Sequence, residues 1–335
     1  MEISGSKILV IGGAGFIGSH LVDQLLEQDV REVLIYDNFT RGRISNLANA
    51  LKDSRVRIAE GGGDKMQLDT LKSAMEGADG VFDFAALWLL HCQKFPRSAF
   101  KVNVEGSFNV IETAISCGVK KIVHSSSASV YGDAVQEPMN EDHPFNFANF
   151  YGATKAATEH IYTGAFNLYK DTQKHFDFVG LRYMNVYGSR QDYLGTYIAV
   201  LMRMLDSIKR GLPIQIYGDG SQSYDFVHVK DCARANLLAM KSDTTNIFLN
   251  VGTEVKTSLN QIGLDLLEIT GSSVGIEYLP EGTSFVTNRV GGKNLAMETI
   301  GFNFEIDIME GLKELVEWRE NHQLDVQERI LSSGL

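Results

Sequence analysis

The stretch "KILVIGGAGFIGSH", residues 7–20, contains the strongest fold signal in this chain. It starts with an apolar run typical of a buried strand and continues, from Phe16, with the apolar spacing of a helix. Gly12 permits a tight turn between them, Gly15 lets the backbone approach a pyrophosphate, and Gly18 lets the helix pack closely on the strand. The stretch therefore predicts a strand, a ligand-binding turn and a helix.

Short apolar runs and amphipathic helices continue to alternate through the first half of the chain. Strands are predicted at 32–36, 56–60, 80–86, 121–126 and 178–183, and helices at 16–28 and 104–117. This pattern is typical of an α/β protein with a Rossmann-type, doubly wound parallel sheet, which binds ligands at the carboxyl ends of its strands.

The regular alternation ends near residue 186. Further on, a helix is expected at 197–210, a turn at 218–221, a helix at 229–241 and a strand at 247–252. We predict an NAD-binding Rossmann domain over residues 1–185, with return segments near 226–260. A smaller, interleaved C-terminal substrate-binding domain is expected to comprise 186–225 and 261–335.

Asp37 indicates which dinucleotide is bound, because it directly follows the second predicted strand. A carboxylate at this place holds the adenosine ribose and repels a 2′-phosphate, so NAD is expected rather than NADP. Arg41 and Arg43 lie close enough to favour NADP instead, and the alternative is that both are solvated surface charges.

The composition limits the partners and the compartment. The 335 residues include 31 basic and 42 acidic side chains, and the net charge of −11 disfavours binding to nucleic acid or anionic membranes. Cys92, Cys117 and Cys232 form no disulfide or C-x-x-C pattern, which indicates a reducing compartment. With no signal peptide, no membrane-spanning run and no metal-ligand spacing among the histidines, we expect a cytoplasmic protein without a metal.

A second pattern lies in "NFYGATKAATEHIY", residues 149–162, where Tyr151 precedes Lys155 by four positions on a predicted helix. Residues four apart share a helix face, and a neighbouring ammonium lowers the pKa of a phenol. Such a tyrosine can take a proton from a hydroxyl group while hydride leaves the same carbon. Upstream, in "VHSSSASVYG", Ser127 lies where its hydroxyl can bond the same oxygen. The alternatives are a surface aromatic, a solvated lysine and a strand-end turn.

Taken together, these stretches resemble the extended short-chain dehydrogenase/reductase family, specifically its NAD-dependent nucleotide-sugar epimerase/dehydratase branch. The resemblance covers roughly residues 7–320, in the family's order. The matching stretches are "GGAGFIGSH", "DNFTRG", "DFAAL", "NVEGSFNVIE", "VHSSSASVYGD", "EDHPFNFANFYGATKAATE", "LRYMNVYGSRQD", "IYGDGSQSYDFVHVKDCARA" and "LNVGT".

The resemblance implies roles for individual residues. Tyr151 is expected to be the catalytic base, Lys155 to bind the nicotinamide ribose and Ser127 to orient the reacting hydroxyl. The residues implied in NAD binding are Gly12, Gly15, Phe16, Ile17, Gly18, Asp37, Asn38, Asp64, Ala85, Ala86, Asn103, Ser125, Tyr151, Lys155 and Tyr183. Those implied in binding a nucleotide-diphosphate sugar are Ser127, Asn185, Tyr224 and Arg289.

Two stretches depart from the family pattern. The family usually has an arginine that grips the substrate diphosphate where Tyr224 stands, so that grip is expected to be weaker or to come from elsewhere. The stretch "LWLLHC", residues 87–92, is more apolar than usual at a place that often faces the sugar. It is either core packing or a pocket wall for an N-acyl or deoxy substituent.

The residues after Ser127 bear on the reaction. The 4,6-dehydratases of this branch carry an Asp-Glu pair there, whereas this chain has Ala128 and Ser129, so dehydration is disfavoured. We expect an epimerase that inverts C4 through a 4-keto intermediate, in cell-surface polysaccharide biosynthesis. The alternatives are a nucleotide-sugar dehydrogenase or 4-keto-sugar reductase with the same triad, and a non-catalytic NAD-binding protein.

The predicted helices at 99–117 and 151–168 have more apolar positions than one sheet face requires. In the family, the matching helices pair two subunits. A homodimer is therefore expected, with burial of these positions within one chain as the alternative.

Overall fold

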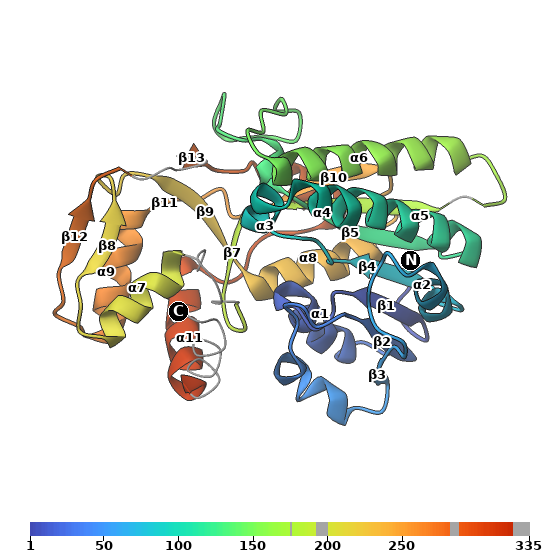
Figure 1. Cartoon of the computed structure of the whole chain (residues 1–335), viewed down its shortest axis with the longest axis horizontal. Coiled ribbons are helices and arrows are strands. Elements are labelled where there is room, and N and C mark those ends of the chain that lie inside the picture. The colour runs from blue at the N-terminus through green and yellow to red at the C-terminus, as the bar shows by residue number, and fades with distance from the viewer. Residues whose placement is uncertain (175, 192–199, 282–287, 324–335) are drawn as a thin grey trace.

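The computed structural model describes residues 1–174, 176–191, 200–281 and 288–323. Its main sheet has seven strands, all parallel, in the order β10-β6-β5-β4-β1-β2-β3 (Figure 1). These strands are β1 (Lys7–Ile11), β2 (Glu32–Tyr36), β3 (Val56–Ile58), β4 (Gly80–Asp83), β5 (Lys121–Ser127), β6 (Asp177–Tyr183) and β10 (Ile247–Val251). The predicted α/β class with a Rossmann-type parallel sheet is confirmed.

The sheet is covered by helices on both faces (Figure 1). One face carries α1 (Phe16–Leu26), α8 (Val229–Lys241) and α10 (Asn294–Ile300), and the other carries α2 (Leu68–Met75), α5 (Gly106–Cys117) and α6 (Phe150–Tyr169). Successive side chains of a strand point to opposite faces, and β1 shows the result. Ile8 and Val10 are buried in the core with α1 and α8, while Leu9 and Ile11 are buried with α2, α5 and α6.

Two predicted strands are shorter in the structure than in the sequence analysis. β3 ends at Ile58 and β4 at Asp83, where 56–60 and 80–86 were expected. One further backbone bond follows each strand, from Ala59 N–H to the Ile35 carbonyl and from Phe84 N–H to the Ile11 carbonyl. Beyond these bonds the chain turns over the carboxyl edge, so the apolar residues that follow are not part of the sheet.

A smaller region lies beside the carboxyl edge of the main sheet, on the left of Figure 1. Its strands are β7 (Asn185–Tyr187), β9 (Ser223–His228), β11 (Lys256–Ser258) and β13 (Asn288–Arg289), with β8 (Ile214–Tyr217) and β12 (Ile276–Leu279) forming a separate pair. Its helices are α7 (Val200–Lys209), α9 (Leu259–Thr270) and α11 (Ile308–Asn321), which share a hydrophobic core with β8 and β9. Of the helix expected at 197–210, residues 197–199 lie outside the described ranges.

Short helical turns complete the described chain. They are η1 (Ile44–Leu47), η2 (Ala50–Lys52), α3 (Leu89–Lys94), α4 (Pro96–Ala99), η3 (Phe100–Glu105) and η4 (Ala128–Val130). The helix predicted at 104–117 is therefore a π-helical turn, η3, that continues into α5. Within the described ranges, no helix has the length and apolar character needed to cross a membrane.

Candidate active site

The glycine loop joins β1 to α1 at the carboxyl edge of the sheet. Gly12 has a φ of +80°, in the left-handed region that favours glycine. A Cβ on Gly18 would lie 2.3 Å from the Gly12 carbonyl oxygen, so α1 approaches the loop too closely for a side chain there. Gly15 precedes α1, and no side chain caps the first turn. Backbone amides at such a helix start suit a phosphate group, so this loop fits the pyrophosphate of a dinucleotide.

Asp37 lies at the end of β2, beside the glycine loop. Its carboxylate accepts hydrogen bonds from the backbone N–H groups of Ala14 (2.9 Å) and Phe39 (2.8 Å). Burial raises the pKa of Asp37, while these two bonds oppose the rise. Each oxygen keeps a further lone pair for a ribose hydroxyl. Asn38, next in the chain, is exposed, and its side chain accepts a bond from Thr40 N–H.

The triple glycine before Asp64 has a packing role. A Cβ on Gly63 would lie 2.1 Å from the carbonyl carbon of Asp37, so only glycine fits against that backbone. This contact brings Asp64 next to the end of β2, where the Tyr36 hydroxyl donates to the Asp64 carbonyl oxygen (2.8 Å). The Asp64 carboxylate is half-buried and accepts from Met66 N–H.

The segment after β4 contains Ala85 and Ala86 and is held by the buried Asn103. The Asn103 amide accepts from Leu87 N–H (2.7 Å) and donates to the Leu87 carbonyl oxygen (3.1 Å). It also donates to the Thr154 hydroxyl on α6 (3.1 Å). The Asn103 side chain therefore bonds to the protein itself and positions this segment. Within the segment, Ala85 packs against the glycine loop at Gly12.

Ser127, Tyr151 and Lys155 come together where β5 ends and α6 begins. The Asn149 side chain caps α6 by accepting from Gly152 N–H (2.8 Å), which sets the start of the helix at Phe150, one residue before Tyr151. Ser127 is close enough to Tyr151 to oppose the rise in the pKa of its phenol, and it caps η4 by accepting from Ser129 N–H (3.1 Å). The buried Lys155 ammonium donates to the Ser125 carbonyl oxygen (2.6 Å), and its nitrogen lies 5.8 Å from the centre of the Tyr151 ring.

Burial dominates the pKa values of Tyr151 and Lys155. Burial raises the pKa of Tyr151 to about 12, although the bond with Ser127 and the charge of Arg289 oppose the rise. Burial also lowers the pKa of Lys155 to about 8, although Asp83 opposes the fall. In the protein alone, desolvation of the phenol therefore outweighs its neighbours. The lowering expected from Lys155 together with an oxidised nicotinamide ring stays a prediction.

Tyr183 lies at the end of β6, the strand that neighbours β5 on the side away from the glycine loop. Its buried hydroxyl lies 3.4 Å from the Ser125 hydroxyl and donates to the Asn236 side chain on α8 (3.0 Å). The Phe16 and Ile17 side chains are half-buried at the start of α1. The predicted NAD-binding residues thus lie along the carboxyl edge of the sheet or at the helix starts that follow it.

Apart from Ser127 on β5, the predicted substrate residues lie in the smaller region. Asn185 begins β7, and its side-chain Nδ2 is buried without a hydrogen-bond partner among the described residues. Tyr224 and Arg289 are paired neighbours on the parallel strands β9 and β13. The charge of Arg289 lowers the pKa of the Tyr151 phenol, so β13 brings this arginine near the predicted catalytic residues.

The comparison with known proteins agrees with this geometry. Residues 8–252 match the model of the NAD dependent epimerase/dehydratase family. The chain belongs to this family. The resemblance expected from the sequence is confirmed, and so is NAD as the cofactor of the family.

Relatives in the epimerase/dehydratase family match over nearly the whole chain. The chain is 30% identical over 334 residues to a UDP-glucose 4-epimerase of Lacticaseibacillus casei, with 94% of this chain and 97% of the relative covered. It is similar in structure to a UDP-N-acetylglucosamine 4-epimerase of Methanobrevibacter ruminantium solved with UDP-N-acetylmuramic acid (TM-score 0.87, 31% identity, 95% and 99% covered). It is equally similar to a Thermotoga maritima UDP-glucose 4-epimerase solved with UDP-glucose (TM-score 0.86, 32% identity, 95% and 99% covered).

One buried ion pair of this family member was missed by the sequence analysis. The Lys65 ammonium lies 3.3 Å from the Asp83 carboxylate and donates to the Ala85 carbonyl oxygen (2.7 Å) and the Ser107 hydroxyl (3.1 Å). Burial alone would raise the pKa of Asp83, but Lys65 and His124 lower it to about 2. The signal was Asp83 itself, since a charge inside an apolar strand requires a partner of opposite sign.

The interpretation of Arg41 as a solvated charge is wrong. Arg41 is half-buried, and its guanidinium carbon lies 4.0 Å from the centre of the Trp88 ring.

The stretch 87–92 is not buried throughout. Only Cys92 is fully buried, while residues 87–91 are half-buried. A role for these residues as a pocket wall stays a prediction.

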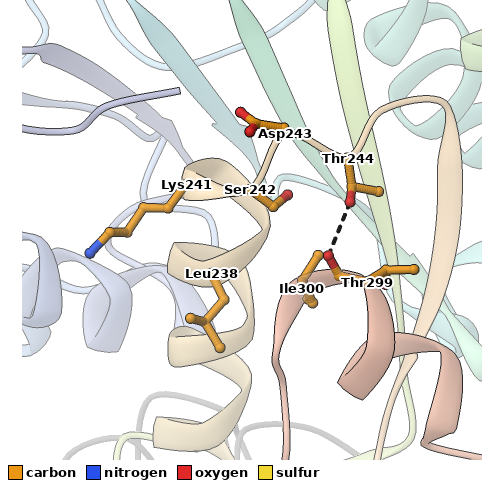
Figure 2. A pocket seen from close by; sticks show the side chains of 7 residues that line it. All are labelled: Leu238, Lys241, Ser242, Asp243, Thr244, Thr299 and Ile300. Carbon is orange, nitrogen blue, oxygen red and sulfur yellow. Dashed lines mark hydrogen bonds between the residues drawn. The ribbon is translucent and has the colours of Figure 1, made fainter.

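A pocket of about 640 Å³ lies away from the candidate active site (Figure 2). It is lined by Leu238, Lys241, Ser242, Asp243, Thr244, Thr299 and Ile300. These residues surround the end of α8 and the segment before β10, at the amino edge of the sheet.

Among the residues that the structure describes, no cluster of three or more His, Cys, Asp and Glu suits a metal ion.

Proposed function

We propose that this protein is an NAD-dependent epimerase that inverts C4 of a nucleotide-diphosphate sugar through a 4-keto intermediate. The observation that carries the proposal is that Ser127 and Tyr151 lie together beside the buried Lys155, at the edge of a sheet with a dinucleotide loop. The names of the relatives support a UDP-sugar as substrate.

Each residue of the triad has a distinct task in this proposal. Tyr151 takes the proton of the C4 hydroxyl, and Ser127 holds the same oxygen by a hydrogen bond. Lys155 remains charged below a pH of about 8 and so favours the phenolate. NAD, when bound, supplies the acceptor and donor of the hydride. The same tyrosine returns its proton once the sugar has presented its other face.

The residues around Ser127 favour epimerisation over elimination of water. Ala128 and Val130, in η4, are buried and carry no acidic group. The nearby Glu159 is buried in an ion pair with Arg182 (2.7 Å), so it is not available as an acid or base for substrate. A dehydrogenase or 4-keto-sugar reductase that uses the same triad is the second candidate.

The decisive experiment incubates purified protein with a panel of UDP- and dTDP-sugars and identifies the sugar products. An epimerase is expected to form the C4 epimer with no net consumption of NAD. Oxidised sugar in proportion to the NAD consumed would favour the dehydrogenase instead. Bound NAD with no conversion of any sugar would favour a non-catalytic binding protein. Tyr151→Phe protein is the control for background conversion.

The domain roles follow from the same proposal. Residues 1–185, with return segments near 226–260, would hold NAD, while 186–225 and 261–335 would hold the sugar nucleotide. Residues 324–335 of this division lie outside the described ranges. All three cysteines are free thiols, which supports a reducing, cytoplasmic location. The proposed substrate class, a nucleotide-diphosphate sugar, supports a role in cell-surface polysaccharide biosynthesis.

The homodimer is proposed from an exposed apolar surface on η3, α5 and α6. The side chains of Phe100, Phe108 and Leu168 are 59%, 43% and 67% exposed. Exposed apolar side chains on neighbouring helices mark interaction surfaces. Sedimentation should show a dimer that Phe108→Glu converts to monomer. A monomeric parent protein would contradict the proposal.

A further inference from the structure

Arg41 and Trp88 touch across the glycine loop. Arg41 lies in the segment after β2, and Trp88 lies in the segment after β4. These two strands flank β1, which leads into the glycine loop (Figure 1). The guanidinium carbon is 4.0 Å from the centre of the indole ring, within the range of a cation–π contact. The contact therefore joins the two sides of the dinucleotide loop.

The backbones on both sides are fixed by other groups. After β2, the Ala14 carbonyl oxygen accepts from Arg43 N–H (3.0 Å) and from the Asn46 side chain (2.9 Å). After β4, the Asn103 side chain bonds both the N–H and the carbonyl oxygen of Leu87. The contact described between the two segments is made by the Arg41 and Trp88 side chains. The backbone bonds that hold either segment do not depend on it.

Trp88 is supported from its own side of the loop. Its ring packs against His91 on α3, with ring centres 5.0 Å apart, and His91 packs against Phe95 at the same distance. This row of rings orients the indole so that one face is presented to Arg41. Both side chains are half-buried, so the contact is partly shielded from water.

We propose that Arg41 and Trp88 form a latch that closes over the pyrophosphate loop and slows the dissociation of NAD. The inference rests on the proposed function in one respect. An epimerase that returns hydride to the same sugar requires a cofactor that stays bound between the two transfers. An enzyme that exchanges its cofactor in every turnover has no such requirement, because its rate benefits from release.

The test measures the dissociation of NADH, the fluorescent form of the cofactor, after dilution into excess NAD. Arg41→Gln and Trp88→Leu remove the cation and the aromatic face while keeping side chains of similar length and apolar character. Each should speed dissociation on the order of three- to thirty-fold, the range expected for loss of one cation–π contact. Arg31→Gln is the matched control, since it removes the same charge at the opposite end of β2, where Arg31 is exposed, and should leave the rate unchanged.

The double variant separates a latch from two independent contacts. If both residues act through one contact, Arg41→Gln/Trp88→Leu should release NADH no faster than the faster single variant. If the two increases in dissociation rate multiply in the double variant, each side chain binds the cofactor separately, and the latch is overturned. Unchanged release in both single variants would overturn it as well. Thermal unfolding of the cofactor-free variants identifies any general loss of structure.

A second measurement places the latch directly. The chain has two tryptophans, so Trp318→Phe leaves Trp88 as the sole tryptophan. Its fluorescence should be transferred to bound NADH, and absence of transfer would remove Trp88 from the cofactor site. None of these measurements involves a sugar nucleotide. Failure of the latch is therefore distinguishable from failure of the proposed epimerase activity.

Discussion

The Lys155 ammonium lies 2.6 Å from the Ser125 carbonyl oxygen and is buried beneath the predicted catalytic tyrosine. Burial lowers the pKa of Lys155 from 10.5 to about 8 in the folded protein. Between these two values the unfolded chain binds more protons than the folded chain. The free energy of unfolding contributed by this site therefore rises with pH across that window.

Lys155→Met should stabilise the protein below a pH of about 8 while abolishing turnover. Removing the buried charge should raise the free energy of unfolding by up to roughly 3 kcal/mol, and losing the hydrogen bond should lower it by about 1 kcal/mol. The gain should fade as the pH rises from about 8 to 10.5. Urea unfolding at several pH values measures it, and a difference that does not vary with pH would contradict the argument.

Lys121 offers the matched control for that experiment. It is also buried, its pKa is also lowered to about 8 by burial, and it donates to the Ser242 (2.7 Å) and Thr244 (2.8 Å) carbonyl oxygens at the amino edge of the sheet. Lys121→Met should show a similar dependence of stability on pH. It should keep turnover and NAD binding, because it lies at the opposite edge from the glycine loop.

Tyr151→Phe should lower kcat by roughly 10²- to 10⁴-fold, the usual contribution of a positioned acid or base. NAD should remain bound, since the glycine loop and Asp37 are unchanged. Tyr162→Phe is the control on the same helix. Its buried hydroxyl has no hydrogen-bond partner among the described residues, so its removal should leave kcat unchanged. Substantial activity in Tyr151→Phe protein would exclude this tyrosine as the base.

Tyr224→Arg should tighten the binding of UDP-sugars. The new guanidinium would lie beside Arg289 on the paired strand, and charge-assisted bonds to a diphosphate should improve affinity on the order of ten- to a hundred-fold. Titration calorimetry with UDP-glucose measures the change. Tyr217→Arg, at an exposed position on β8, controls for added charge. Equal affinities in both variants would show that position 224 does not face the diphosphate.

Asp37→Asn should shift the cofactor preference towards NADP. Removing one repulsive charge near a partly buried site should improve the affinity for NADPH relative to NADH by about tenfold. Fluorescence titration with both cofactors measures the ratio, and Asp69→Asn, at an exposed position on α2, is the control. An unchanged ratio would assign the preference to another residue.

Local pattern was sufficient for much of the fold. The bounds of β2 and α8 agree with the sequence prediction, because each is a continuous apolar or amphipathic run that ends in a turn. The place of Asp37 followed as well. In a parallel sheet, a residue just after a strand must lie at the carboxyl edge, whatever the rest of the chain does.

The contacts between segments depended on the tertiary structure. The sequence by itself determined the sheet, the dinucleotide loop and the spacing of Tyr151 and Lys155, since these depend on neighbours a few residues apart. Only the folded chain paired Arg289 with Tyr224, Lys65 with Asp83 and Arg41 with Trp88. Strand order and crossover connections bring these distant residues together, and desolvation at the resulting contacts, rather than residue spacing, sets the pKa of Tyr151.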